Sequence, residues 1–155
     1  MRTTKKIEGS LGGLGSVELI QVTAAIIQRN GKLLLCQRPI GKRCALLWEF
    51  PGGKIERGET PEECLVRECY EELGITIKTE QFAQEVMYEY PDITVNIHFY
   101  FCEIISGDPV CIEHNDVQWF SLEEVSKLSL CPADDKMLSL LSKDIKKYLA
   151  STSSN

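Results

Sequence analysis

Three glutamates and one arginine lie close together in a short segment of the chain. Arg67, Glu68, Glu71 and Glu72 fall within six residues, shortly before Gly74. On a helix, side chains three or four residues apart are neighbours, so Glu68 would lie beside both Glu71 and Glu72. Like charges at this spacing destabilise a helix unless something neutralises them. Clustered carboxylates are also the ligands that a hard divalent cation such as magnesium prefers.

Two interpretations of this acidic segment are open from its own residues. One is an exposed, solvated helix face on which Arg67 pairs with the glutamates. The other is a metal site, which the preceding Phe50-Pro51-Gly52-Gly53-Lys54 favours, because glycine has no Cβ atom and lets the backbone approach a cation or phosphate closely. For Gly52-Gly53 taken alone, a tight turn is a sufficient explanation.

The acidic segment is predicted to form a helix that begins at Thr60. Thr60 can cap the helix, Pro61 suits the first helical position, and Glu63 completes a capping box. Gly74 is typical of a helix end in the left-handed conformation. The glutamates then form a solvent-facing stripe opposite a broad apolar arc. The residues predicted on the buried arc are Leu65, Val66, Cys69, Tyr70 and Leu73.

Runs of β-branched and aromatic residues predict strands on both sides of this helix. Asn30-Gly31 indicates a hairpin between the first two. Ser121-Leu122-Glu123-Glu124 forms another capping box, and a final amphipathic helix is predicted over residues 132–149. This order indicates an α+β fold, a mixed sheet flanked by helices. The predicted strands cover residues 17–28, 32–37, 46–50, 76–90, 94–104 and 117–120.

Length and composition fit one globular domain with a single core. The chain has 155 residues, of which 43% are hydrophobic and 26% charged. We expect a flexible N-terminal tail over residues 1–16, one domain over residues 17–150 and a polar C-terminal tail over residues 151–155.

Charge, apolar runs and cysteine usage narrow the class of protein. Seventeen basic and twenty-three acidic residues give a net charge of −6, which argues against a nucleic-acid polymer as partner. No apolar run is long enough to cross a bilayer, and no apolar core of a secretory signal follows Met1. The seven cysteines are odd in number and form no C-x-x-C pair, so we expect reduced, mostly buried thiols in a cytoplasmic protein.

The glycine, glutamate and arginine positions together carry a family resemblance. Gly53, five residues, Glu59, seven residues and then residues 67–75 match the pattern G-x5-E-x7-R-E-U-x-E-E-x-G-U, in which U is aliphatic. Only Cys69 departs from an aliphatic position, and a buried thiol behaves as a small hydrophobe. The chain therefore resembles the Nudix hydrolase family. Its segments 48–56, 88–92, 119–122 and 132–134 are similar to the MutT-like branch, and the resemblance covers about residues 19–145.

The resemblance implies a fold, an activity and a cofactor. It implies a Nudix fold, a mixed β-sheet sandwiched between helices, and a hydrolase that converts a nucleoside triphosphate to monophosphate and pyrophosphate. In the MutT-like branch the expected substrate is 8-oxo-dGTP, so the enzyme would remove oxidised nucleotides before DNA replication. The implied cofactor is Mg2+, for which Mn2+ could substitute, and the expected state is a monomer or weak dimer.

The resemblance also implies roles for individual residues. Glu68 is the expected general base, Arg67 is expected to orient the carboxylates, and Glu59 to support them. His98 in a strand and His114 in a loop are expected to be structural or solvated. The implied metal ligands are Glu68, Glu71, Glu72, Glu113 and the carbonyl of Gly52 or Gly53. The implied substrate contacts are Arg38, Arg43, Glu49, Phe50, Pro51, Gly52 and Asp134.

Asp134 departs from the family pattern, which has asparagine at this position. Asparagine can donate to O6 of 8-oxoguanine and accept from its protonated N7, whereas an ionised aspartate only accepts. Asp134 could share a proton with Asp135 and so donate. Alternatively, it could accept from N4 of cytosine, as suits a CTP or modified-dCTP pyrophosphohydrolase. A third interpretation is that Asp134 only caps the final helix.

Two further classes of function are weighed against the triphosphate hydrolase. A non-catalytic Nudix binding or regulatory module would be expected to have lost carboxylates from the pattern, whereas this chain keeps all of them. A hydrolase of a dinucleotide such as NADH or ADP-ribose is not favoured, because the sequence contains no added domain and no zinc-type cysteine set.

Overall fold

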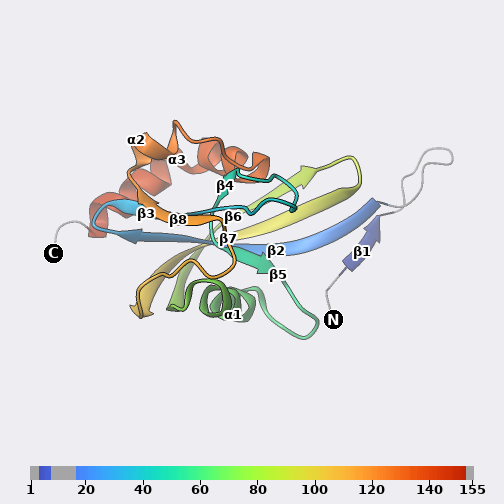
Figure 1. The fold of residues 1–155 in the computed structure, drawn as a ribbon, viewed down its shortest axis with the longest axis horizontal. Coiled ribbons are helices and arrows are strands. Elements are labelled where there is room, and N and C mark those ends of the chain that lie inside the picture. The colour runs from blue at the N-terminus through green and yellow to red at the C-terminus, as the bar shows by residue number, and fades with distance from the viewer. Residues whose placement is uncertain (1–3, 8–16, 153–155) are drawn as a thin grey trace.

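The computed structural model describes residues 4–7 and 17–152 of the chain (Figure 1). An eight-stranded mixed sheet lies between α1 on one face and α2 and α3 on the other. The predicted α+β architecture, with a mixed sheet sandwiched between helices, is confirmed. The elements are β1 (Thr4–Ile7), β2 (Val17–Arg29), β3 (Lys32–Gln37), β4 (Trp48–Glu49), β5 (Gly52–Lys54), α1 (Pro61–Leu73), β6 (Thr76–Glu89), β7 (Ile93–Ser106), β8 (Asp116–Phe120), α2 (Leu122–Val125) and α3 (Pro132–Thr152).

Strand β2 organises the sheet. One edge of β2 pairs in parallel with β7, and β6 pairs antiparallel with β7. The other edge of β2 is shared in turn by β1, β5 and β3. Because β3 pairs with β2 only next to the Asn30-Gly31 turn, the middle of that edge is left to β5. The glycines of β5 are thereby held against Thr23 and Ala24.

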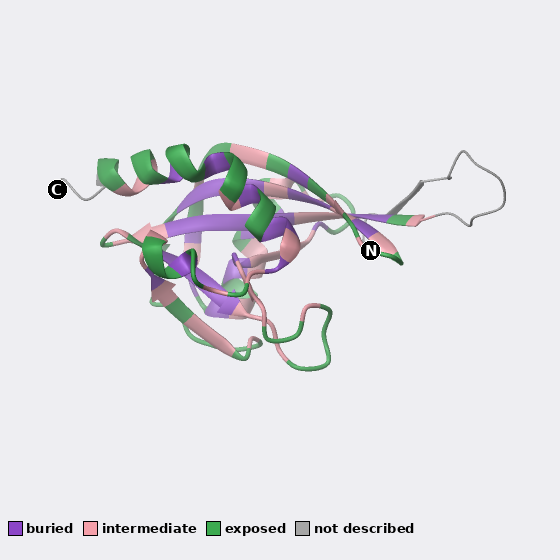
Figure 2. Cartoon of the chain, turned by 90° about the horizontal axis from the view of Figure 1, so that it is seen from above, coloured by how far each residue is buried: buried purple, intermediate pink, exposed green. Residues whose placement is uncertain are grey.

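Alternation along β2 divides the hydrophobic core into two clusters. Ile26 belongs to a cluster with Met137 of α3, whereas its neighbour Ile27 belongs to a cluster with Leu65 of α1. Successive residues of a strand point to opposite faces, so both faces of β2 are buried. Figure 2 shows these buried strands below a helix whose outer side is exposed. Among the described residues no helix is both long and apolar enough to span a membrane.

The predicted bounds of the two tails are partly wrong. Thr4–Ile7, predicted within a flexible tail, form β1 and pair antiparallel with residues 17–20. The free edge of β2 offers unpaired backbone groups there, which a neighbouring strand can satisfy. The remainder of residues 1–16 lies outside the described residues. Helix α3 continues to Thr152, so it includes the first two residues of the predicted C-terminal tail.

Helix α1 begins and ends where the sequence predicts, but its buried side is different. The Thr60 side chain accepts a hydrogen bond from the backbone N–H of Glu63 at 3.1 Å, and Gly74 is left-handed with φ 66°. Val66 and Tyr70, predicted to be buried, are 37% and 65% exposed. The sheet cannot cover both ends of so wide an arc, and it covers the side nearer the glutamates. The buried residues are Cys64, Leu65, Cys69 and Leu73.

Candidate active site

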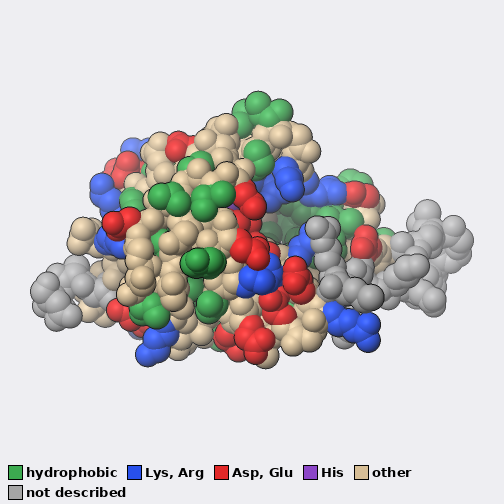
Figure 3. Space-filling view, turned by 60° about the horizontal axis from the view of Figure 1, so that its bottom comes forward, with side chains coloured by type: hydrophobic (Ala, Val, Ile, Leu, Met, Phe, Trp, Pro, Cys, Tyr) green, Lys and Arg blue, Asp and Glu red, His purple; other side chains and the backbone are tan. Residues whose placement is uncertain are grey.

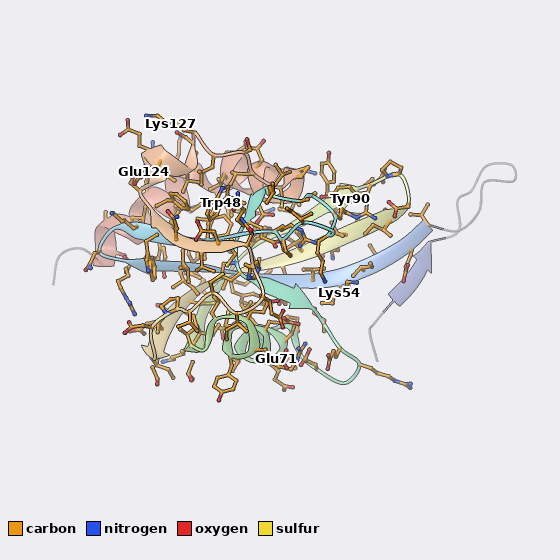
Figure 4. The ribbon with its side chains drawn as sticks, viewed as in Figure 1. Trp48, Lys54, Glu71, Tyr90, Glu124 and Lys127 are labelled. Atoms are coloured by element: carbon orange, nitrogen blue, oxygen red, sulfur yellow. The ribbon has the colours of Figure 1, made fainter. Side chains whose placement is uncertain are left out.

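An open cleft of about 840 Å3 crosses the molecule from α1 to the start of α3. Figure 3 shows a hollow on this face that is bordered by acidic and basic side chains. In Figure 4, Glu71 lies on the α1 side of the sheet and Tyr90 on the α3 side, with Lys54 at the end of β5. Of the predicted site residues, Pro51 and Glu59 are not part of the lining. Those that line the cleft are Arg38, Arg43, Glu49, Phe50, Gly52, Gly53, Arg67, Glu68, Glu71, Glu72, Glu113 and Asp134.

Strand β5 needs both of its glycines. The sequence predicts a loop at Gly52-Gly53, but the two residues form a strand wedged between β2 and α1. A Cβ atom on Gly52 would lie 1.9 Å from the backbone oxygen of Thr23. A Cβ atom on Gly53 would lie 2.3 Å from the carboxylate carbon of Glu68. Only glycine permits so close an approach of backbone to strand and to helix.

The two glycine carbonyls point in different directions. Backbone hydrogen bonds join β5 to β2 at Pro51 and Ile55, with lengths of 2.8 and 3.0 Å. The pair Thr23↔Gly53 lies midway between these bonds. Alternation in an antiparallel ladder therefore turns the N–H and C=O of Gly53 toward Thr23. The carbonyl of Gly52 faces away from β2, so of the two predicted carbonyl ligands it is Gly52 that is available to a cation.

Arg67 connects the acidic side chains to one another and to β5. Its Nε and Nη2 donate to the two oxygens of Glu59 at 2.7 and 2.8 Å, and Nη1 donates to Glu68 at 3.0 Å and Glu71 at 3.2 Å. Nη2 also donates to the carbonyl of Lys54 at 3.2 Å. The hydrogen bonds from Arg67 lower the pKa of Glu59 to about 2, and Glu59 in turn raises the pKa of Arg67.

Glu68 and Glu72 are less exposed than the sequence predicts. Their side chains are 15% and 14% exposed, because α1 turns them toward β5 and the cleft rather than toward bulk solvent. Glu71 remains 53% exposed. The three glutamates therefore have different environments on one helix.

Glu72 provides the clearest test of whether a divalent cation fits the site. Its Oε2 is buried and has no hydrogen-bond partner among the described residues. Burial, together with Glu68, Glu49 and Glu113, raises the pKa of Glu72 to about 9. A buried carboxylate of this kind ionises at neutral pH only beside a positive charge.

The oxygen ligands around Glu72 suit such a cation in kind, although their side chains do not meet at one point. Within the described part of the chain, no three carboxylate, imidazole or thiol side chains converge as a metal site. Glu68 is instead turned toward Arg67, which neutralises it. Carboxylates repel one another at short range, so their convergence depends on the cation itself.

His114 lies in the cleft, although the sequence predicts a structural or solvated role. Its side chain is 8% exposed, and Nε2 is 3.8 Å from Oε2 of Glu49 and 3.8 Å from Oε2 of Glu72. Only its position next to Glu113 could have indicated this. His98 has the structural role that was expected, because its Nε2 lies 2.8 Å from Oε1 of Gln21 on the sheet.

Asp134 lies at the other end of the cleft and is buried. Its Oδ1 accepts a hydrogen bond from the backbone N–H of Phe50 at 2.9 Å. Burial, reinforced by Glu49, raises the pKa of Asp134 well above its ordinary value. Asp135 is exposed, so burial and not a proton shared with Asp135 accounts for this shift. As the third residue of α3, Asp134 lies inside the helix and not at its cap position.

The two arginines predicted to contact substrate are already paired. Nη1 of Arg38 donates to both carboxylate oxygens of Glu49, at 3.2 and 3.0 Å. Arg43 pairs with Asp92, and its guanidinium lies over the ring of Tyr90, 4.8 Å from the centroid. Arg38 therefore borders the cleft interior, whereas Arg43 fastens its own loop to the β6–β7 turn.

A mixed sheet between helices, with a carboxylate-bearing helix packed on a glycine strand, defines a Nudix-type domain. The family comparison agrees, because the NUDIX domain family matches residues 19–141, most of the chain. The chain belongs to the Nudix family, and it is a hydrolase of that family.

Three known proteins illustrate the similarity. The CTP pyrophosphohydrolase of Escherichia coli (strain K12) is 38% identical over 122 residues, covering 79% of this chain and 90% of that protein. The 8-oxo-dGTP diphosphatase of the same organism is 34% identical over 123 residues, covering 79% and 95%. The crystal structure of a MutT protein from Methanosarcina mazei Go1 superposes with a TM-score of 0.73 at 26% identity, covering 81% of this chain and 94% of that one. The resemblance to the MutT-like branch is confirmed.

Proposed function

We propose that this protein hydrolyses nucleoside triphosphates to monophosphates and pyrophosphate. The observation that carries the proposal is the buried, unpartnered Oε2 of Glu72, which lies beside Glu68 at one end of a cleft that reaches Asp134 at the other. A cation-binding end suits phosphates, and a buried hydrogen-bonding end suits a nucleobase. The names of both curated relatives, which act on nucleoside triphosphates, support the same class of substrate.

The chemistry requires a water, a base and neutralisation of phosphate charge. Glu68 would accept the proton of the attacking water, while Arg67 holds its carboxylate in place through Nη1. The divalent cation, which we propose is Mg2+ with Mn2+ as a substitute, would be held by the carbonyl of Gly52 and the carboxylates of Glu68, Glu71, Glu72 and Glu113. When bound, it neutralises phosphate charge and lowers the pKa of a coordinated water.

The rest of the cleft would bind and orient the nucleotide. Arg38, fixed by Glu49, is available to the sugar and phosphates, and Phe50 and Asp134 line the end proposed for the base. Arg43 would act at the rim, through the loop that it fastens to Asp92. Glu59 would support the site indirectly, because it holds Arg67.

We propose 8-oxo-dGTP as the preferred substrate. Oδ1 of Asp134 accepts one hydrogen bond from the N–H of Phe50 and keeps a second lone pair, and the raised pKa favours the neutral carboxyl group. A neutral carboxyl group donates once and still accepts, as an asparagine amide does. It can therefore read O6 and the protonated N7 of 8-oxoguanine together. Ordinary guanine has an unprotonated N7, so it would leave one of these hydrogen bonds unmade.

CTP or a modified dCTP is the second candidate, because a 38% identical relative is named a CTP pyrophosphohydrolase. The amino group at N4 of cytosine would donate to Asp134.

A metal-supplemented assay should yield pyrophosphate rather than orthophosphate, and kcat/KM should be compared for 8-oxo-dGTP, dGTP, CTP and 5-methyl-dCTP. We expect 8-oxo-dGTP to exceed dGTP by at least about tenfold, the value of one hydrogen bond of about 1.4 kcal/mol.

Asp134→Asn tests whether the neutral form of this side chain binds the base. It should keep the preference for 8-oxo-dGTP, because asparagine offers the same donor and acceptor. If wild type shows no preference for 8-oxo-dGTP over dGTP and hydrolyses CTP best, the cytosine assignment replaces the oxidised-guanine assignment. Orthophosphate as the main product would overturn the proposed reaction.

The setting of the enzyme is also a proposal. Five of its seven cysteines are buried and all seven are free, which supports a reducing, cytoplasmic location. We propose a monomer or weak dimer, which sedimentation at several concentrations would test.

A further inference from the structure

A buried thiol and hydroxyl meet beneath β5. Cys64 of α1 is fully buried and Thr23 of β2 is 1% exposed. The Sγ of Cys64 lies 3.3 Å from the Oγ1 of Thr23. Residues so deeply buried can serve packing alone, so their polar contacts decide whether they do more.

Both side chains also contact the backbone of β5. The thiol of Cys64 donates to the carbonyl of Lys54 at 3.3 Å and lies 3.6 Å from the carbonyl of Gly53. The hydroxyl of Thr23 lies 3.4 Å from the same Gly53 carbonyl. Burial raises the pKa of Cys64 to about 12, so the thiol keeps its proton and can donate at neutral pH.

The same strip of backbone touches the candidate catalytic side chains. Nη2 of Arg67 donates to the Lys54 carbonyl at 3.2 Å and lies 3.8 Å from the Cys64 sulfur. Gly53 packs so closely on Glu68 that a Cβ atom would come within 2.5 Å of Oε1. A small displacement of β5 relative to α1 would therefore move the Gly52 carbonyl away from Glu68 and Glu72.

We propose that Cys64 and Thr23 are positioning residues, which hold β5 against α1 and so fix the Gly52 carbonyl relative to the carboxylates of Glu68 and Glu72. Reacting groups have to be held within about 0.5 Å of their productive geometry. Neither residue needs to touch the substrate. This inference rests on the proposed divalent-cation site and hydrolysis.

Cys69 provides a matched control on the same helix. It is also fully buried, but it packs with Leu65 and Leu73 in the core on the α1 side of the sheet. Cys64→Ala and Cys69→Ala remove the same atom from equally buried sites. Only Cys64→Ala removes a hydrogen bond to β5. If Cys64 served packing alone, the two variants should have similar effects on Mn2+ binding and rate.

The test measures Mn2+ binding by calorimetry, the Mg2+ concentration for half-maximal rate, kcat, nucleotide KM and Tm. For Cys64→Ala and Thr23→Val we expect several-fold weaker Mn2+ binding, a matching rise in the Mg2+ requirement and a fall in kcat of about tenfold, with KM little changed. Cys64→Ser should recover much of the loss, because a hydroxyl can donate to the Lys54 carbonyl. Cys69→Ala should lower Tm alone.

The outcomes separate this inference from the proposed function. If Cys64→Ala and Cys69→Ala change Mn2+ binding alike, or neither changes it, the positioning role is overturned. Mn2+ binding does not depend on turnover, so the comparison holds even if wild type hydrolyses no triphosphate, a result that would instead overturn the proposed function. If Cys64→Ala does not fold, Thr23→Val and Cys64→Ser make the same comparison.

Discussion

The glutamates of α1 lie in three different environments on one helix. Glu68 accepts a hydrogen bond from Arg67, Glu71 is half exposed, and Glu72 has a buried Oε2 with no hydrogen-bond partner among the described residues. Spacing on the helix brings them together, and burial raises the pKa of Glu72. Arg67 neutralises one side of the cluster, which leaves Glu72 as the carboxyl group that most needs a cation.

Glu68→Gln tests the proposed base. Glutamine keeps the size of the side chain and can still accept from Arg67, but it takes no proton from water, so kcat should fall by about 100- to 10,000-fold. Glu63→Gln, on the exposed first turn of the same helix, should match wild type in rate and Tm. Steady-state rates with Mg2+ and with excess chelator test both requirements. Near wild-type turnover of Glu68→Gln, or wild-type turnover in chelator, would contradict the assignment.

At the scale of elements, the sequence predicts what is local and misses what depends on distant pairing. Thr60 and Gly74 mark the ends of α1 correctly because their capping contacts lie within a few residues. The strand character of Gly52 and the direction of its carbonyl arise from pairing with β2, some thirty residues away in the chain. His114 enters the cleft for a similar reason, since no local periodicity reports on it.

Replacing each glycine of β5 by alanine should have a different effect, on the rate in one case and on stability in the other. The Cβ of Gly53→Ala would meet the end of the flexible Glu68 side chain, so the fold should survive while kcat falls by about 100-fold or more. The Cβ of Gly52→Ala would meet the Thr23 backbone, which cannot swing aside, so Tm should fall by several degrees. Rates and thermal unfolding of the two variants check this. If both variants lose the same amount of stability, the Glu68 side chain does not move aside for the new Cβ atom, and the prediction is wrong.

For the whole molecule, the sheet separates two hydrophobic cores, and the cleft borders the core on the α3 side. The core on the α3 side includes Phe50, and the one on the α1 side includes Leu65 and Cys69. Asp134 is buried at this border, where it costs stability whenever it ionises. The enzyme therefore keeps at its centre groups that a more stable protein would replace.

Asp134 should make this cost visible as a dependence of stability on pH. Its folded-state pKa is raised well above 3.8, so its stabilising contribution is complete below about pH 3.8 and is lost as pH rises through the folded-state pKa. Asp134→Asn stays neutral, so its Tm should gain on wild type steadily as pH increases from about 4 to 8. Asp135→Asn, at the exposed neighbouring position, should run parallel to wild type. Thermal unfolding of the metal-free proteins across this range gives the comparison, and parallel curves for Asp134→Asn and wild type would show that Asp134 does not carry a raised pKa.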